Sequence, residues 1–384
     1  MIVRANPATS TIGTPGINVI GYIRGEFGLG ESARAYARAL IGAGIPVSVY
    51  DVDIDLAHGR DDHSMDAWLS EELPHPISLV FINPDCWERA MEKIGRARLQ
   101  GCYVIACWFW ELERIPNEWI AVIDGIDALM AATEFIGQAL RRATNKQILR
   151  VPYPLEATAD SGLQRKDFCL DDEKIVFLSS FDFNSFWMRK NPIAVIHAFI
   201  KAFPDHRDGV QLLIKSSNGF RYPDKLRMLM DAARADSRII IRDDVIPRTH
   251  ITALQRCCDV YVSLHRAEGL GLGLAECMAQ GKPVIATAWS GNMEFMDETN
   301  SCLVDYRFIE VGVGDYYAAE GQRWADPDVD VAAMWMRRLV DEQDLPQRIG
   351  ARAREVSKQL SPQRSVEEFA KRIASIAAAA QVIP

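Results

Sequence analysis

The sequence lacks an excess of positive charge, a membrane-spanning apolar run and any low-complexity tract. It has 43 Lys and Arg residues against 52 Asp and Glu residues, for a formal net charge of −9. This balance argues against a general nucleic-acid binder. No apolar run is long enough to cross a bilayer as a helix. Since 48% of the residues are hydrophobic and 25% are charged, we predict a soluble globular protein.

The cysteines lack the spacing of a metal site. None forms a C-x-x-C pair or a Cys/His ligand pattern. We expect reduced thiols, mostly small core residues, because several lie in apolar runs. The sequence also shows no signal-peptide pattern, so we expect a cytoplasmic protein. The eight cysteines are Cys86, Cys102, Cys107, Cys169, Cys257, Cys258, Cys277 and Cys302.

The pattern along the chain predicts an α/β protein with two domains. A chain of 384 residues exceeds one ordinary core. Short apolar runs alternate with helical stretches, which indicates doubly wound, Rossmann-like parallel sheets covered on both faces. The expected strands are Ile17–Tyr22, Pro46–Val52, Ile77–Ile82, Cys102–Trp108 and Ala128–Ala131, then Lys174–Ser179, Val210–Lys215, Ile239–Arg242, Val260–Leu264 and Pro283–Ala286.

A proline-containing segment separates the two series. Pro152 and Pro154 resist helix and strand alike, and polar residues follow them, so we place the interdomain linker there. This predicts a first domain over residues 1–156, a second over residues 157–361 and a final helix over residues 362–384. Ser361 is the expected N-cap of that helix and Pro362 its first residue.

The stretch Glu268-Gly-Leu-Gly-Leu-Gly-Leu-Ala-Glu276 predicts a ligand site. Glycines allow a backbone to approach a ligand closely, and the N-terminus of the following helix attracts phosphate. Two carboxylates would repel that phosphate, so we expect them to bind hydroxyl groups on either side of it. A nucleotide-sugar has this shape. The alternative, a glutamate that merely favours the helix dipole, explains Glu276 but not the pair.

A second glycine loop, Gly25-Glu-Phe-Gly28-Leu-Gly30-Glu31, precedes an expected helix over Glu31–Gly42. It leaves two interpretations open: a dinucleotide fingerprint with a permissive alanine ending, or a tight turn that needs glycine for packing. A nicotinamide enzyme would use an acid after the next strand, and Asp51, Asp53 or Asp55 could serve. Such an enzyme has no need of the second loop at Glu268, which favours the nucleotide-sugar interpretation.

The loop and its tail, Ala-Gln-Gly281-Lys-Pro-Val-Ile-Ala286, resemble the hallmark of glycosyltransferase family 4. The resemblance covers nearly the whole chain. Gly25–Glu31 resembles the family's N-terminal loop, Trp187-Met-Arg-Lys190-Asn-Pro192 its phosphate motif, and Trp110-Glu-Leu-Glu-Arg-Ile-Pro116 a segment of bacterial polysaccharide and lipopolysaccharide transferases. The resemblance implies a GT-B fold, with two Rossmann-like domains facing across a cleft and a C-terminal helix crossing back to the first domain.

The resemblance also implies roles for single residues. Glu268 would face the donor sugar, Glu276 would hold the ribose, and Lys190 would bind the donor phosphates. Arg189 is a neighbour of Lys190. The family's usual arginine is replaced by Asn184 or Ser185. The backbone N–H groups of the loop would hold the diphosphate, with Gly28 and Gly30 contributing from the first domain; the loop residues are Gly269, Leu270, Gly271, Leu272 and Gly273.

For several further candidate site residues, two interpretations remain open. Lys215 either supplies phosphate-binding charge at a strand end or extends along the strand end toward solvent. His265 is either structural or a donor contact. Glu111 and Glu113 take an acceptor-side role or pair with Arg114. A basic group is either a solvated helix face with its following loop or a contact with anionic lipid; it comprises Arg141, Arg142, Lys146 and Arg150.

The reaction that the resemblance implies is retaining transfer of a hexose from a UDP- or GDP-sugar to a hydroxyl of a glycan or lipid-linked acceptor. It needs no cofactor and no metal: the Asp51-Val-Asp53-Ile-Asp55 stretch follows a first-domain strand, away from the expected donor site. The remaining hypotheses are a nicotinamide oxidoreductase and a sugar-nucleotide-binding protein without catalysis. We expect a cytoplasmic enzyme of polysaccharide or glycolipid biosynthesis, with peripheral contact at the inner face of the cell membrane as the lipid interpretation.

Overall fold

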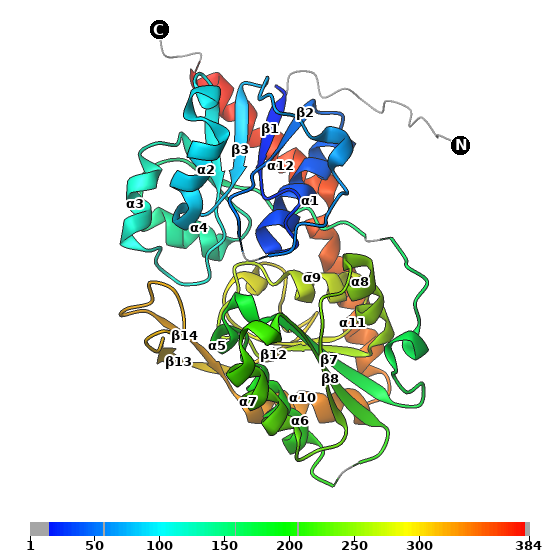
Figure 1. Cartoon of the computed structure of the whole chain (residues 1–384). Coiled ribbons are helices and arrows are strands. Elements are labelled where there is room, and N and C mark those ends of the chain that lie inside the picture. Colours follow the sequence, from blue (N-terminus) through cyan, green and yellow to red (C-terminus); the bar gives the residue numbers. More distant parts are fainter. Residues whose placement is uncertain (1–14, 57, 158, 206, 381–384) are drawn as a thin grey trace, which may run out of the picture. The chain divides into compact units, whose positions relative to one another are not determined.

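The computed structural model describes residues 15–380 except 57, 158 and 206. Within this part the chain forms two compact units. The first contains the residues up to Trp110, Arg114–Glu156 and the residues from Leu360 onward. The second contains Ala157–Gln359 together with the short segment Glu111–Glu113. Figure 1 labels helices and strands of both units.

The described part of the first unit holds a parallel sheet of six strands in the order β2-β1-β3-β4-β5-β6. The strands are β1 (Ile17–Gly21), β2 (Val47–Asp51), β3 (Ile77–Phe81), β4 (Tyr103–Cys107), β5 (Ala128–Ala131) and β6 (Ile148–Arg150). The helices are α1 (Gly28–Gly42), α2 (Trp87–Ile94), α3 (Asn117–Ile123), α4 (Glu134–Arg141) and α12 (Pro362–Ala380), with short 3-10 turns η1 (Asp66–Trp68), η2 (Pro84–Cys86) and η3 (Arg96–Leu99).

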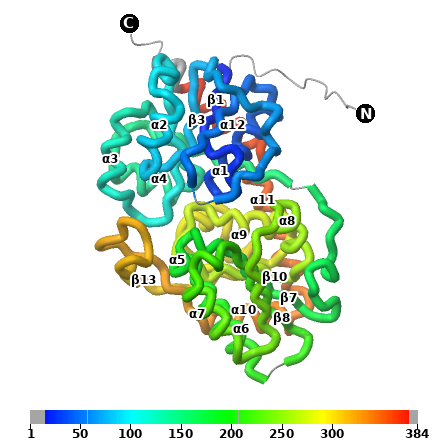
Figure 2. Tube along the Cα trace, in the orientation of Figure 1, coloured from blue at the N-terminus to red at the C-terminus, as the bar shows by residue number. Residues whose placement is uncertain are grey.

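The strands of this unit form because their apolar residues are buried on both faces. All residues of β1 and β3 are buried, as is typical of parallel strands that helices cover on both sides. The C-terminal helix α12 packs against α1 and β6; Figures 1 and 2 show it in red beside the blue α1. Helix α12 thus contributes buried residues to the core of the first unit.

The second unit repeats this architecture. Its parallel sheet has the order β12-β11-β10-β7-β8-β9 among the described residues. The strands are β7 (Ile175–Asp182), β8 (Val210–Ser217), β9 (Ile239–Asp243), β10 (Val260–Ser263), β11 (Val284–Thr287) and β12 (Cys302–Val304). The helices are α5 (Trp187–Lys190), α6 (Pro192–Ala202), α7 (Pro223–Ala233), α8 (Arg248–Cys257), α9 (Leu272–Ala279), α10 (Val329–Asp341) and α11 (Leu345–Ser357). The 3-10 turns are η4 (Arg165–Phe168), η5 (Phe183–Ser185), η6 (Gly219–Arg221), η7 (Gly291–Glu294) and η8 (Lys358–Leu360), the last at the boundary with the first unit.

A separate antiparallel hairpin of the second unit joins β13 (Tyr306–Glu310) to β14 (Arg323–Pro327). Its register pairs Phe308 with Ala325. Trp324 is buried, whereas Phe308 is exposed and contacts Trp289 with ring centroids 4.8 Å apart. This hairpin was not predicted from the sequence, because charged residues interrupt its apolar alternation.

The predicted fold class is confirmed: both sheets are parallel and doubly wound. Two local expectations were wrong. The helix expected from Glu31 begins at Gly28, inside the glycine loop. The loop expected at the end of the basic group instead forms β6, a three-residue edge strand that is too short to give a periodic signal. Cys107, Cys258, Cys277 and Cys302 are buried, and all eight cysteines are free thiols.

Candidate functional site

The site of the second unit lies where the order of its sheet reverses. From β7 the chain proceeds through β8 to β9 on one side, and β10 lies on the other side of β7. Open parallel sheets bind ligands at the carboxyl ends of the strands at such a switch point. Lys190 follows β7 and Glu268 follows β10. The topology therefore brings together two predicted site residues that are 78 positions apart.

Glu268 is held through its side chain by two cations. Its Oε1 lies 2.5 Å from Lys190 Nζ, and its Oε2 lies 3.1 Å from Arg189 Nη1. The loop after β11 holds its backbone: the Glu268 N–H donates to Ser290 Oγ at 2.8 Å, and the Glu268 carbonyl accepts from the Gly291 N–H at 2.8 Å. Contacts from two segments, α5 and the loop after β11, therefore fix Glu268.

Ser290 holds this position in a strained conformation. Its φ of +84° and ψ of −147° lie in a region that almost only glycine adopts. A Cβ on Gly291 would lie 2.0 Å from the carbonyl oxygen of Gly269, so only glycine permits the close approach of the two loops. Backbone strain of this kind is concentrated at functional sites.

The electrostatics keep Glu268 ionised. Burial alone would raise its pKa, but Lys190 and Arg189 lower the pKa to about 2. Burial lowers the pKa of Lys190 below its usual value, against the attraction of Glu268. Burial would also lower the pKa of Arg189, but Glu268 and Glu111 raise it. The cluster thus holds a carboxylate among cations in a site with little access to water.

The glycine loop opens directly into α9. Gly271 has φ +86°, which favours glycine, and it precedes the first residue of α9. A Cβ on Gly273 would lie 2.7 Å from the hydroxyl of Tyr261. Among the described residues no side chain caps this helix. Backbone conformation and packing therefore explain Gly271 and Gly273. The N-terminus of α9 has no side-chain cap, and such helix N-termini bind anions.

Glu276 is buried in α9 and contacts α8. It forms an ion pair with Arg248, and Gln255 Nε2 donates to its Oε2 at 2.8 Å. These two partners could not be predicted from the sequence, because Arg248 and Gln255 lie 28 and 21 positions before Glu276 without a distinctive spacing. They hold the carboxylate that we predicted to bind ribose.

The side chains of Lys215 and His265 are both buried in the second unit. Lys215 is buried at the end of β8, and its Nζ lies 3.0 Å from Asp244 Oδ1 and 2.6 Å from the carbonyl of Ser216. His265 is fully buried between Ser263 Oγ at 3.0 Å and Asn292 Oδ1 at 3.1 Å. Burial lowers its pKa, so the ring is neutral at pH 7. The geometry favours the structural interpretation of His265, and the burial of Lys215 argues against a side chain that extends toward solvent. A donor contact by either residue stays a prediction.

Glu111 and Glu113 belong by their contacts to the second unit. Glu111 accepts a hydrogen bond from the hydroxyl of Tyr316 and lies 3.8 Å from Arg189 Nη2. Glu113 pairs with Arg323 of β14 at 3.0 Å. Glu111 is thus part of the Glu268 cluster. Tyr316 was missed from sequence because it stands in the loop of a hairpin that was not predicted.

Two glycines in the glycine loop of the first unit have different surroundings. A Cβ on Gly30 would lie 2.4 Å from the carbonyl oxygen of Gly25 and 2.6 Å from that of Tyr22. Gly30 is therefore required for packing. Gly28 has no such neighbour within 4 Å among the described residues. The buried Arg34 fixes the loop by donating to the carbonyls of Ile23 at 2.7 Å and Gly25 at 2.8 Å.

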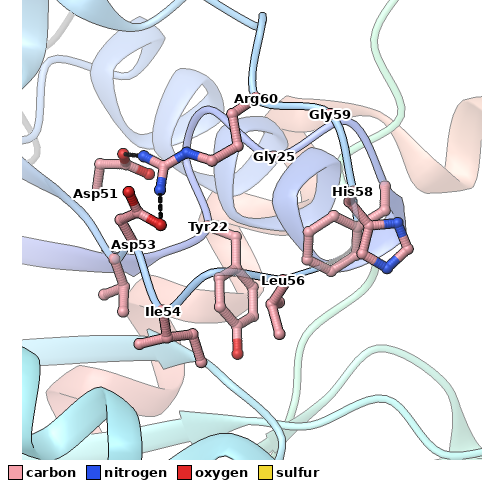
Figure 3. Close-up of a pocket in the computed structure, with 11 residues that line it drawn as sticks. Tyr22, Gly25, Asp51, Asp53, Ile54, Leu56, His58, Gly59 and Arg60 are labelled. Carbon is pink, nitrogen blue, oxygen red and sulfur yellow. Dashed lines mark hydrogen bonds and ion pairs between the residues drawn. The ribbon is translucent and has the colours of Figure 1, made fainter.

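A small pocket lies beside this loop, at the ends of β1 and β2 (Figure 3). Arg60 joins Asp51 and Asp53 across it, with 2.6 Å between Arg60 Nη2 and Asp51 Oδ2. The ring of His58 stacks on Phe27 with centroids 4.2 Å apart. Asp51 and Asp53, two of the three acids that could serve a nicotinamide cofactor, are therefore engaged by an arginine of their own chain.

The basic group of the first unit is largely paired. Arg141 lies 2.6 Å and Arg150 lies 3.2 Å from carboxylate oxygens of Glu134. Lys146 donates to the carbonyl of Asp124 at 3.2 Å. No helix within the described residues combines the length and apolar character needed to span a bilayer. Nor does this part of the chain group three His, Cys, Asp or Glu side chains as metal ligands.

The family model for glycosyl transferases group 1 matches residues 175–310, a segment that contains both Lys190 and Glu268. No curated protein sequence matches the chain significantly.

Solved structures show the fold. HepE from Anabaena, determined with UDP and glucose, is 13% identical, with a TM-score of 0.64 over 94% of this chain and 100% of its own. Sucrose-phosphate synthase from Thermosynechococcus elongatus is 14% identical, with a TM-score of 0.66 over 95% of this chain and 100% of its own. The pneumococcal O-GlcNAc transferase GtfA, determined with UDP and GlcNAc, is 14% identical, with a TM-score of 0.56 over 78% of this chain. This chain spans 57% of that protein.

At these identities the similarity establishes the fold, which is GT-B: two units, each built on a doubly wound parallel sheet. The group 1 match and the fold together support a glycosyltransferase of the GT-B type.

Proposed function

We propose that the protein is a retaining glycosyltransferase that moves a hexose from a nucleotide-diphosphate sugar to an acceptor hydroxyl. The observation that carries this proposal is the Lys190–Glu268 pair at the carboxyl ends of β7 and β10, beside the N-terminus of α9. A cation and the backbone N–H groups at a helix N-terminus suit a diphosphate, and the adjacent carboxylate suits sugar hydroxyls.

In the proposed reaction the bond between the anomeric carbon and the diphosphate oxygen breaks, and the acceptor oxygen bonds to that carbon on the same face. The departing phosphate takes the acceptor's proton, so the protein supplies no nucleophile. Its task is to position both substrates and to stabilise the leaving diphosphate. Lys190 and the loop N–H groups would provide that stabilisation without a metal or cofactor.

Glu276 is proposed to hold the ribose hydroxyls, oriented by Arg248 and Gln255. UDP-hexoses are the first donors to test, because HepE and GtfA were both determined with UDP; GDP-sugars are the alternative. We propose a glycan or lipid-linked acceptor in polysaccharide or glycolipid biosynthesis. This rests on the resemblance of the Trp110–Pro116 segment to bacterial transferases of that kind.

The test is hydrolysis of a panel of UDP- and GDP-sugars to free nucleotide, with and without added glycan acceptors. We expect slow hydrolysis by the wild type and its loss in Glu268→Gln, which keeps the side-chain shape and removes the charge. Glu298→Gln, an exposed carboxylate of the same unit, is the matched control. A wild type that binds a donor without turning it over would instead be a sugar-nucleotide-binding protein, and the enzyme proposal would fail.

A further inference from the structure

Arg189 lies between two carboxylates. Its Nη1 is 3.1 Å from Glu268 Oε2 and donates to the carbonyl of Ala267 at 2.8 Å, while its Nη2 is 3.8 Å from Glu111 Oε1. Its side chain is only 5% exposed. A buried guanidinium bound on both sides cannot move to a ligand without leaving buried charges unpaired, which is strongly unfavourable. We therefore regard Arg189 as a fixed member of the cluster.

Tyr316 secures this arrangement in two ways. Its hydroxyl donates to Glu111, the second partner of Arg189. Its ring packs on Phe186 with centroids 4.6 Å apart. Phe186 immediately precedes the short helix α5, which carries Arg189, and holds a φ of +60° that neighbouring contacts must maintain. The loop of the β13–β14 hairpin thus contacts Arg189 indirectly, through the carboxylate of Glu111 and through Phe186, whose backbone continues into α5.

Lys190 differs from Arg189 in the same cluster. Its side chain is 21% exposed, and its ammonium bonds Glu268 at 2.5 Å. An arriving diphosphate competes with Glu268 for this ammonium, because phosphate oxygens and carboxylates use the same donor. If Lys190 transferred to the phosphate, Glu268 would be a buried carboxylate without a partner unless Arg189 stayed in place.

We propose that Glu111 and Tyr316 are positioning residues that fix Arg189 as the permanent partner of Glu268, so that Lys190 can exchange Glu268 for the donor diphosphate. This inference rests on the proposed function, because it concerns the same site. It divides the two neighbouring cations into one that orients the carboxylate toward the sugar and one that binds the leaving group.

The experiment compares Tyr316→Phe, Glu111→Gln and the double variant with the wild type. Tyr316→Phe removes only the hydroxyl and keeps the ring on Phe186. Tyr317→Phe, the exposed neighbour in the same loop, is the control. UDP affinity is measured by calorimetry, donor hydrolysis by release of UDP, and folding by circular dichroism.

We expect each variant to bind UDP within about twofold of the wild type, since Lys190 is untouched, and to hydrolyse the donor on the order of tenfold to a hundredfold more slowly through misplacement of Glu268. The double variant should be no slower than Glu111→Gln alone, because Tyr316 acts through Glu111. A purely structural role would lower UDP affinity and hydrolysis together.

Unchanged hydrolysis in both variants, a parallel loss of UDP affinity, or losses that multiply in the double variant would each overturn the inference while the proposed function stands. A wild type that hydrolyses no donor in the panel would overturn the proposed function and this inference with it.

Discussion

Lys190 Nζ lies 2.5 Å from Glu268 Oε1, although the residues are 78 positions apart and follow different strands. The contact exists because β7 and β10 are neighbours in the parallel sheet and both end at the same edge. Burial strengthens the attraction between the two charges. The pair therefore places a cation and a carboxylate side by side at the edge of the sheet where a ligand would bind.

The first prediction concerns acid stability. The pKa of Glu268 is about 2 in the folded protein and near 4.3 in an unfolded chain. Its ionised form therefore stabilises the fold above about pH 4.3, and that contribution is lost as the pH falls toward 2. We expect Glu268→Gln to reduce the free energy of unfolding by roughly 3 kcal/mol at pH 7. At pH 3 this reduction should be smaller by roughly 2 kcal/mol.

Urea unfolding at the two pH values measures this difference. Glu355→Gln, an exposed carboxylate, should show no comparable dependence on pH. A Glu268→Gln effect of the same size at pH 3 and pH 7 would mean that the depressed pKa does not contribute to stability.

The second prediction separates the two glycines before α1. Gly30→Ala should lower the free energy of unfolding by about 1–3 kcal/mol, because its Cβ would collide with two carbonyl oxygens. Gly28→Ala should be neutral or stabilising by up to ~1 kcal/mol. If the loop approaches a ligand, Gly28→Ala should nevertheless lower turnover. Thermal unfolding and donor hydrolysis report the two effects, and normal turnover in a stable Gly28→Ala would remove Gly28 from the site.

The third prediction tests ribose binding by Glu276. Glu276→Gln should weaken UDP binding by about 1.5–3 kcal/mol, and 2′,3′-dideoxy-UDP should bind both forms alike, because it lacks the hydroxyls. Calorimetry with the two nucleotides makes the comparison, and Glu298→Gln is again the control. An equal loss for both nucleotides would show that Glu276 acts through Arg248 or packing and not on the ribose.

The fourth prediction concerns the basic group of the first unit. If this group contacts anionic lipid, Glu134→Gln should increase binding to phosphatidylserine vesicles, because it releases Arg141 and Arg150 from their shared carboxylate. Replacing all four basic residues by alanine should weaken binding by roughly 1 kcal/mol per residue. Co-sedimentation measures both. Identical sedimentation of all three proteins would leave the group as a paired surface.

The sequence allowed the fold class to be predicted because parallel strands such as β1 and β3 are short, mainly apolar runs between glycine- and proline-containing turns. Glu268 and Glu276 could be singled out because their glycine-filled spacing is local. The partners of these residues could not be predicted: Arg189 meets Glu111, and Glu276 meets Arg248, only after the strands are ordered. The same holds for Ser290, whose role depends on a backbone conformation that its residue type does not indicate.

The central claim is that Lys190 and the loop before α9 bind the diphosphate of a nucleotide donor. Calorimetric titration of UDP and uridine into the wild type and Lys190→Ala tests it most directly. We predict that the wild type binds UDP more tightly than uridine, and that Lys190→Ala weakens UDP binding by about 1.5–3 kcal/mol without affecting uridine. Unchanged UDP affinity in Lys190→Ala, or no preference of the wild type for UDP over uridine, would contradict the account.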